Sequence, residues 1–234
     1  MKRVSLILLV VIALFTGCRH ESHPKTVSLP FEDFTSLTCN CPIKLTFSEK
    51  ATKIVLTAEE DLIDAFQFKY DNGMLTISIN NMIVHTWDEQ PWVILPMPTR
   101  LSYIKFWNMV SMDADATIVS PSLTMDFSSA INIDNFDIDV DNLMITSWIY
   151  GTNINLSGKA EKVTLDLHST SFDAFQLDVK DYNTTLWSST AYLNCSDSLY
   201  VKTANSSTIF YKGTCGLYEE SGNIINSSIN YVKE

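Results

Sequence analysis

Five segments between Leu123 and Gly213 repeat one pattern, and this repetition is the feature that most limits how the chain can fold. The segments begin at Leu123, Leu143, Val163, Tyr182 and Leu199. Each opens with apolar residues at alternating positions, crosses a corner of small residues and then resumes the alternation. Alternation is typical of β-strands, and a repeat of about 20 residues is typical of a β-solenoid. The sequence therefore predicts an all-β fold, a parallel β-solenoid (β-helix) over residues 101–213.

The apolar residues of each repeat are predicted to point inward. They are Leu123, Met125, Phe127, Leu143, Ile145, Val163, Leu165, Leu167, Leu186 and Val201. Because parallel strands stack about 4.8 Å apart, equivalent residues should lie on one another in continuous apolar columns. Matching corners hold Ser128-Ser129, Gly151-Thr152, Ser169-Thr170, Ser188-Ser189 and Ser206-Ser207. We expect the hydroxyl groups there to bond to the backbone of the tight bends.

The amino terminus has the features of a lipoprotein signal peptide over residues 1–17. Lys2 and Arg3 precede an apolar run from Val4 to Phe15, which is too short to cross a bilayer as a stable helix. The run ends in Phe15-Thr16-Gly17-Cys18, which resembles the lipobox of bacterial lipoproteins. We therefore expect lipidation at Cys18, followed by a flexible tether over residues 18–30. An ordinary signal peptide with an incidental cysteine is the alternative.

The formal net charge of the chain is −11 at pH 7. A field of this sign repels phosphate backbones and anionic headgroups, so nucleic acid is not an expected partner. The lipid on Cys18 should then be the only attachment to a membrane. We expect this membrane to be the outer membrane, with the protein on either its periplasmic or its cell-surface face. The sequence has no phosphate-binding loop, nucleophile elbow or metal-ligand motif, so no cofactor and no metal are expected.

Residues 31–100 predict an N-terminal β-rich region that caps one end of the solenoid, whose strand edges would otherwise be exposed. Asp71-Asn72-Gly73 is a turn signal between alternating segments on either side, so a hairpin is expected there. Residues 59–65 predict one helical turn. Residues 214–234 depart from the repeat, and we expect this tail either to cap the other end or to fray.

Four cysteines lie in the body of the chain: Cys39, Cys41, Cys195 and Cys215. Cys39 and Cys41 are two residues apart, so in a strand they share a face but are poorly placed to bond each other. Cys195 and Cys215 are about one coil apart and could meet across neighbouring coils. They are expected either as a disulfide of an exported protein or as buried free thiols.

The order of motifs resembles the bacterial family described as "putative auto-transporter adhesin, head GIN domain". The matching segments are Ile43-Lys44-Leu45, Leu75-Thr76-Ile77-Ser78-Ile79, Val93-Ile94-Leu95-Pro96, Leu101-Ser102-Tyr103-Ile104, the five corners and Tyr211-Lys212-Gly213. The resemblance covers nearly the whole folded part. It implies a β-solenoid exported by Bacteroidota-type bacteria, often as a lipoprotein. No catalytic residues come with it.

Asp137, Asp139 and Asp141 are the strongest sequence argument for catalysis. They are spaced two residues apart, so one face of a strand carries all three carboxylates. Parallel β-helices that cleave acidic polysaccharides use such clusters for calcium binding or acid–base chemistry. Outward positions of a solenoid must be polar in any case, so the three carboxylates do not require a catalytic role. Catalysis at this carboxylate face is therefore kept as the alternative function, and no residue is predicted to be catalytic.

Aromatic residues favour a binding function instead. Trp148 and Trp187 fall at or beside corners, and together with Tyr150 and Tyr192 they are the candidate ligand contacts. Exposed aromatic rings on a rigid scaffold suit stacking on sugar rings or packing against a protein partner. We therefore predict a lipid-anchored cell-envelope protein with a non-catalytic, adhesin-like binding or structural role, whose partner is a glycan or a protein. The alternatives are a polysaccharide-acting enzyme and a periplasmic scaffold or signalling partner.

Overall fold

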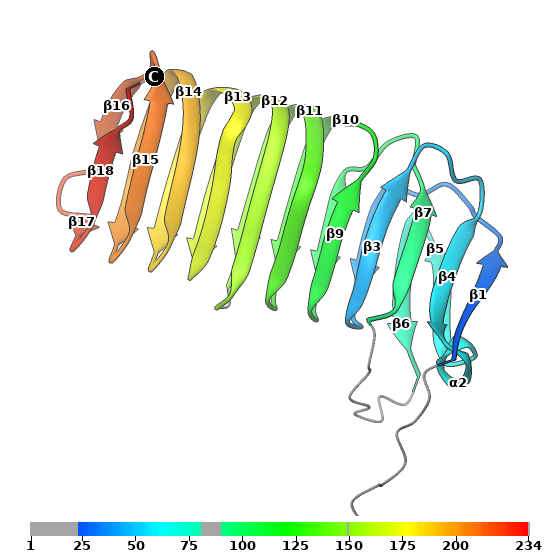
Figure 1. Ribbon diagram of the computed structural model, residues 1–234. Helices are drawn as coiled ribbons and strands as arrows, with labels where there is room; N and C mark the ends of the chain where they lie inside the picture. Colours follow the sequence, from blue (N-terminus) through cyan, green and yellow to red (C-terminus); the bar gives the residue numbers. More distant parts are fainter. Residues whose placement is uncertain (1–22, 81–89, 149, 234) are drawn as a thin grey trace, which may run out of the picture.

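Parallel strands stacked along one axis form most of the molecule (Figure 1). The computed structural model describes residues 23–80, 90–148 and 150–233. The solenoid strands are β8 (Tyr103–Phe106), β9 (Val110–Ala114), β10 (Ile118–Phe127), β11 (Ile131–Ser147), β12 (Thr152–His168), β13 (Thr170–Trp187), β14 (Thr190–Asn205), β15 (Thr208–Gly213), β16 (Gly216–Glu219), β17 (Ile224–Ile225) and β18 (Ser228–Tyr231). The predicted all-β fold and parallel β-solenoid are confirmed.

The strand register places equivalent residues of successive repeats on one another. Leu123 pairs with Leu143, which pairs with Val163, and the same column continues through Tyr182 and Leu199. All of the residues predicted to point inward are at most 2% exposed. The period-two alternation therefore placed the core correctly, because each coil buries its apolar side chains against the coils above and below it.

A ladder of buried hydroxyl groups follows one corner of the solenoid. The backbone N–H of Thr170 donates to Ser189 Oγ at 3.1 Å, and that of Ser189 donates to Ser207 Oγ at 3.1 Å. The N–H of Ser207 in turn donates to Ser227 Oγ at 2.9 Å. Each hydroxyl thus satisfies a buried backbone donor of the preceding coil, as the corner residues predicted.

The corner also needs a left-handed backbone, which the residue before each hydroxyl supplies. Ser169, Ser188 and Ser206 have φ angles of 51°, 49° and 52°. Gly151 occupies the same place in an earlier coil, with φ 87°. Small side chains at this position let the chain turn while neighbouring coils remain in register.

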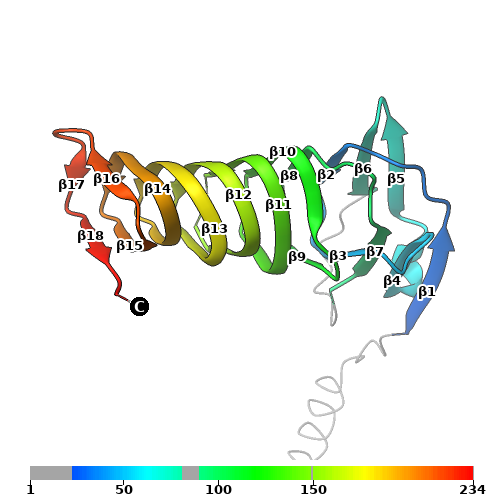
Figure 2. The same ribbon diagram turned by 90° about the horizontal axis from the view of Figure 1, so that it is seen from above.

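The N-terminal region continues the stack and then ends it. Its elements are β1 (Pro24–Leu29), β2 (Ser36–Cys39), β3 (Ile43–Ser48), β4 (Ile54–Glu59), α2 (Glu60–Ile63), β5 (Phe66–Asp71), β6 (Met74–Ile79) and β7 (Trp92–Pro96). Strand β2 lies in parallel between β6 and β8, and β3 lies in parallel between β7 and β9. Beyond them β5 pairs antiparallel with β6, and β4 pairs antiparallel with β7 (Figure 2). These antiparallel strands cover the edge that an open solenoid would expose.

Of the three local predictions for this region, the hairpin and the helical turn are present, and the flexible tether is not present from Pro24 onward. The hairpin across Asn72 and Gly73 is confirmed, and both residues have positive φ, as a tight two-residue turn requires. The helical turn is also present, as α2. The expected tether must be corrected, because its residues from Pro24 onward form β1 and pair antiparallel with β4. Val27 and Leu29 are half-buried against the core, and this short apolar alternation was too brief to stand out in the sequence.

At the other end, the tail after the last full repeat is also in strands. β16 and β17 pair in parallel with β14, and β18 pairs in parallel with β15. The tail thus adds a partial final coil to the stack. Cys18 and the expected signal peptide lie outside the described residues. Within those residues, no helix is long and apolar enough to cross a membrane.

Candidate functional site

Three rings from consecutive coils stack into an aromatic ladder made of Trp148, His168 and Trp187. The ring centroids of Trp148 and His168 are 4.7 Å apart, with 24° between the ring planes. Those of His168 and Trp187 are 6.0 Å apart, with 12° between the planes. The register pairs His168 with Trp187, so the spacing of the coils holds the rings in place. We call this set the aromatic ladder.

The aromatic ladder is accessible from outside the solenoid. Trp148 is 56% exposed and Trp187 is 39% exposed. Since stacked rings cover one another's faces, the ladder presents ring edges along its length. The coil beyond Trp187 carries Asn205 at the matching position, and the coil before Trp148 carries Ser128. Both side chains are small, so neither provides a further ring to the stack.

His168 is the member of the ladder that the sequence analysis missed. Its Nε2 lies 3.5 Å from Asp166 Oδ1, which is ion-pair distance for a protonated imidazole, and its ring lies between the two indoles. The signal was present in the repeat: Trp148, His168 and Trp187 occupy equivalent positions of successive coils. It was overlooked because a single histidine at a corner is usually only a solvated residue.

The two tyrosines named as candidate contacts lie elsewhere. Tyr150 is 81% exposed at the turn before β12. Tyr192 belongs to a second stack, in which its ring centroid lies 5.1 Å from that of Phe210 and 5.3 Å from that of Phe175. The candidate aromatic contacts thus fall into two stacks and one separate residue, rather than one ridge.

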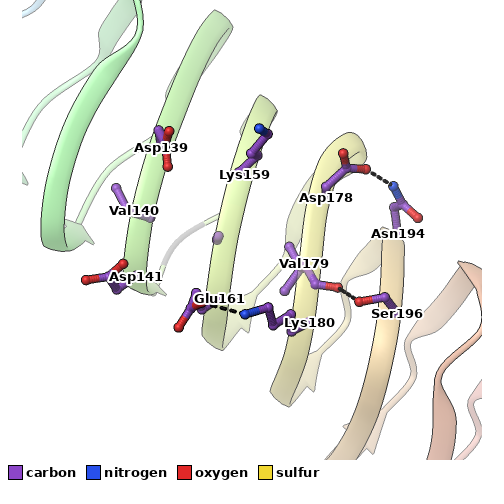
Figure 3. A pocket seen from close by; sticks show the side chains of 11 residues that line it. Asp139, Val140, Asp141, Lys159, Glu161, Asp178, Val179, Lys180, Asn194 and Ser196 are labelled. Atoms are coloured by element: carbon purple, nitrogen blue, oxygen red, sulfur yellow. Dashed lines mark hydrogen bonds and ion pairs between the residues drawn. The ribbon is translucent and has the colours of Figure 1, made fainter.

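A groove of about 420 Å³ crosses β11, β12, β13 and β14 (Figure 3). One side is a row of polar residues from successive coils: Asp139, Lys159, Asp178 and Asn194. The other side is a second row: Asp141, Glu161, Lys180 and Ser196. Val140, Ala160 and Val179 lie between the rows and give the groove a narrow apolar floor. Acceptors and donors alternate along the first side, whereas two carboxylates precede Lys180 on the second, and both sides can form hydrogen bonds to a polar ligand.

Several groups in the groove are already paired. Asn194 Nδ2 donates to Asp178 Oδ1 at 2.8 Å, and Lys180 Nζ donates to Glu161 Oε1. This hydrogen bond from Lys180, reinforced by its charge, lowers the pKa of Glu161. Within the described part of the chain, Asp139 and Lys159 form no hydrogen bond or salt bridge, so their side chains are available to a ligand.

The predicted carboxylate face is divided by the structure. Asp139 and Asp141 line the groove, whereas Asp137 accepts hydrogen bonds from Thr117 Oγ1 at 2.5 Å and from Ser157 Oγ at 2.8 Å. Asp137 therefore ties neighbouring coils together. Lys159 belongs to β12 and Lys180 to β13, and both face the groove. Among the described residues, no group of three or more His, Cys, Asp or Glu side chains could hold a metal ion.

Comparison with known proteins identifies relatives of this architecture. The family model described as "Putative auto-transporter adhesin, head GIN domain" matches residues 33–215. A crystal structure of a "putative adhesin" from Bacteroides fragilis has a TM-score of 0.76 at 13% identity, covering 90% of this chain and 97% of that one. A "putative adhesin" from Parabacteroides distasonis has a TM-score of 0.65 at 15% identity, with coverages of 91% and 98%. A "putative lipid binding protein" from the same organism has a TM-score of 0.56 at 15% identity and the same coverages. At these identities the likeness shows the fold alone. No curated protein matches the chain.

Proposed function

We propose a non-catalytic, adhesin-like binding role at the cell envelope for this chain, which belongs to the auto-transporter adhesin head GIN domain family. The aromatic ladder is the observation that carries the proposal. Its three rings are fixed by the stacking of the coils, so they lose little conformational entropy when a ligand binds. Exposed, pre-positioned aromatic rings are typical of surfaces that bind sugars or protein partners.

Attachment to the outer membrane through lipid on Cys18 is part of the same proposal. The apolar run and the Gly17-Cys18 pair support it. The structure is compatible with this geometry, because the chain enters the fold at β1, at the capped end of the solenoid (Figure 1). The aromatic ladder lies several coils away from that end, so an anchor there would leave it free to meet a partner.

Replacing Trp187 by alanine is expected to weaken ligand binding at least tenfold, because it removes one end of the aromatic ladder. The probes are arrays of glycans and of purified extracellular-matrix proteins, followed by titration of each ligand found. Trp92→Ala is the matched control, since Trp92 is also 39% exposed but lies in β7, far from the ladder. Equal losses in the two variants, or no loss in Trp187→Ala, would contradict the proposal.

The groove supports a second candidate, a polysaccharide-acting enzyme, because Asp139 and Lys159 pair an unbonded carboxylate with an unbonded ammonium group. The two functions predict different results for Asp139→Asn. A binding protein should keep its ligand affinity within about twofold, whereas an enzyme dependent on this carboxylate should lose turnover by a factor of 100 or more, about 2.7 kcal/mol of transition-state stabilisation. The measurement is release of reducing or unsaturated ends from acidic polysaccharides, with and without calcium. Turnover by the wild type that Asp139→Asn abolishes would establish the enzyme.

A periplasmic scaffold or signalling partner is the third candidate function for a protein at the cell envelope. Protease treatment of intact cells separates it from an adhesin. A surface adhesin should be cleaved from intact cells, and protection of the whole folded domain would place it on the periplasmic side.

A further inference from the structure

Cys195 and Cys215 lie on neighbouring coils near the C-terminal end of the solenoid. Cys195 is in β14, and Cys215 lies between β15 and β16. The backbone N–H of Cys215 donates to the carbonyl oxygen of Cys195 at 3.3 Å. Cys195 pairs in register with Gly213, two residues before Cys215, and the hydrogen bond brings the backbone of Cys215 into direct contact with that of Cys195. A disulfide needs its two Cα atoms within about 7 Å, which residues joined by a backbone hydrogen bond satisfy. The backbones therefore already stand at a distance that a disulfide can bridge.

The two thiols differ in their access to solvent. Both are free thiols; Cys195 is completely buried and Cys215 is partly exposed. Burial, and then hydrogen bonding with the Cys215 thiol, raise the pKa of Cys195. A buried thiol of raised pKa is a poor first nucleophile, whereas the partly exposed Cys215 can reach the disulfide of an oxidant in solvent.

We propose that Cys195 and Cys215 are a cross-linking site, which an oxidised thiol–disulfide oxidoreductase converts into a disulfide joining β14 to the last coil. The biological setting rests on the proposed export of the chain, because such oxidants act outside the cytoplasm. The Cys215 thiolate first attacks the oxidant's disulfide, forming a mixed disulfide and releasing one oxidant thiolate. The Cys195 thiolate then attacks Cys215 Sγ and displaces the second oxidant thiolate. Two protons and two electrons leave the cysteines, and the oxidant becomes a dithiol.

The position of the cross-link gives it a structural consequence. Within the described residues, β16, β17 and β18 pair with a coil on one side only. Solenoid coils are stabilised by their neighbours, so a terminal coil opens more readily than an internal one. A bond from Cys195 to Cys215 closes the loop between them and limits the opening of this final coil.

Peptide mapping tests the cross-link directly. The purified, fully reduced chain is incubated in a glutathione redox buffer, its free thiols are alkylated, and it is digested with trypsin without reduction. We expect a disulfide between the peptide 181–202, which holds Cys195, and the peptide 213–233, which holds Cys215. The peptide 26–44, which holds both Cys39 and Cys41, is the internal control. Alkylation of both Cys195 and Cys215 after oxidation, or their pairing with other cysteines, would overturn the proposal.

Hydrogen exchange then tests the consequence. Amides of β16 to β18 should exchange about tenfold more slowly in the oxidised chain than in the reduced one, while those of β11 and β12 should not change. The difference should vanish in Cys215→Ala, whose partly exposed side chain can be truncated with little effect on the fold. Equal exchange in the oxidised and reduced wild type would refute the stabilising role. Neither experiment depends on the aromatic ladder, so its outcome is separate from that of the Trp187→Ala test.

Discussion

Gly158→Ala is expected to lower the free energy of unfolding by about 3–5 kcal/mol. The substitution both strains the backbone and overpacks a close contact between two coils. Gly158 has φ +102°, a conformation that residues with a side chain rarely adopt. A Cβ there would lie 2.1 Å from the carbonyl oxygen of Ile138 on the neighbouring coil. That oxygen belongs to the ladder between β11 and β12, so it cannot move away without separating the two strands.

Gly222→Ala is the matched control. Gly222 also has positive φ, at +86°, but an added Cβ would meet nothing within 4 Å. Only the backbone strain remains, so we expect a loss of about 1–2 kcal/mol. Denaturant unfolding followed by far-ultraviolet circular dichroism measures both variants. Similar losses in the two would show that the close approach of the coils at Gly158 is not as the structure has it.

Phe172→Ala should cost about 3–5 kcal/mol, the usual range for emptying the site of a fully buried phenylalanine. Phe172 lies in β13 and is 0% exposed. The register sets it between Ile154 of β12 and Ala191 of β14, so the cavity would open inside the apolar interior. Because coils depend on their neighbours, hydrogen exchange should accelerate most in β12 to β14.

Phe175→Ala provides the comparison within the same strand. Phe175 is only half-buried and contacts Tyr192 edge to face, with ring centroids 5.3 Å apart. Its removal should cost about 1 kcal/mol. If the two phenylalanines proved equally important, the assignment of inward and outward faces in β13 would be mistaken.

The repeat predicted the solenoid and its core because both depend on rules that act within a single strand. Alternation decides which side chains point inward, and so Met125, Ile145 and Leu165 were assigned correctly. The corner hydroxyls were predictable for a similar reason, since the repeat aligns Ser189 with Ser207 and both satisfy the backbone in the same way.

The groove was not predictable, because it depends on which residues of different coils meet. Asp139 lies beside Lys159, and Lys159 beside Asp178, only because of the exact pairing of β11, β12 and β13. That pairing includes register shifts between Ile133 and Phe136 and between Asn155 and Ser157, which the period of the repeat does not reveal. The sequence therefore suggested an acidic face, where the structure has a groove of mixed charge.

The aromatic ladder, the groove and the hydroxyl ladder all require equivalent residues of successive coils to be direct neighbours. Nuclear Overhauser effects between methyl groups in a perdeuterated, methyl-labelled sample test this requirement. The Ile145 methyl should show contacts to the methyl groups of both Met125 and Leu165, with which the register pairs it. Absence of these contacts, or Hα–Hα contacts typical of antiparallel pairing between β11 and β12, would contradict the stacked parallel coils.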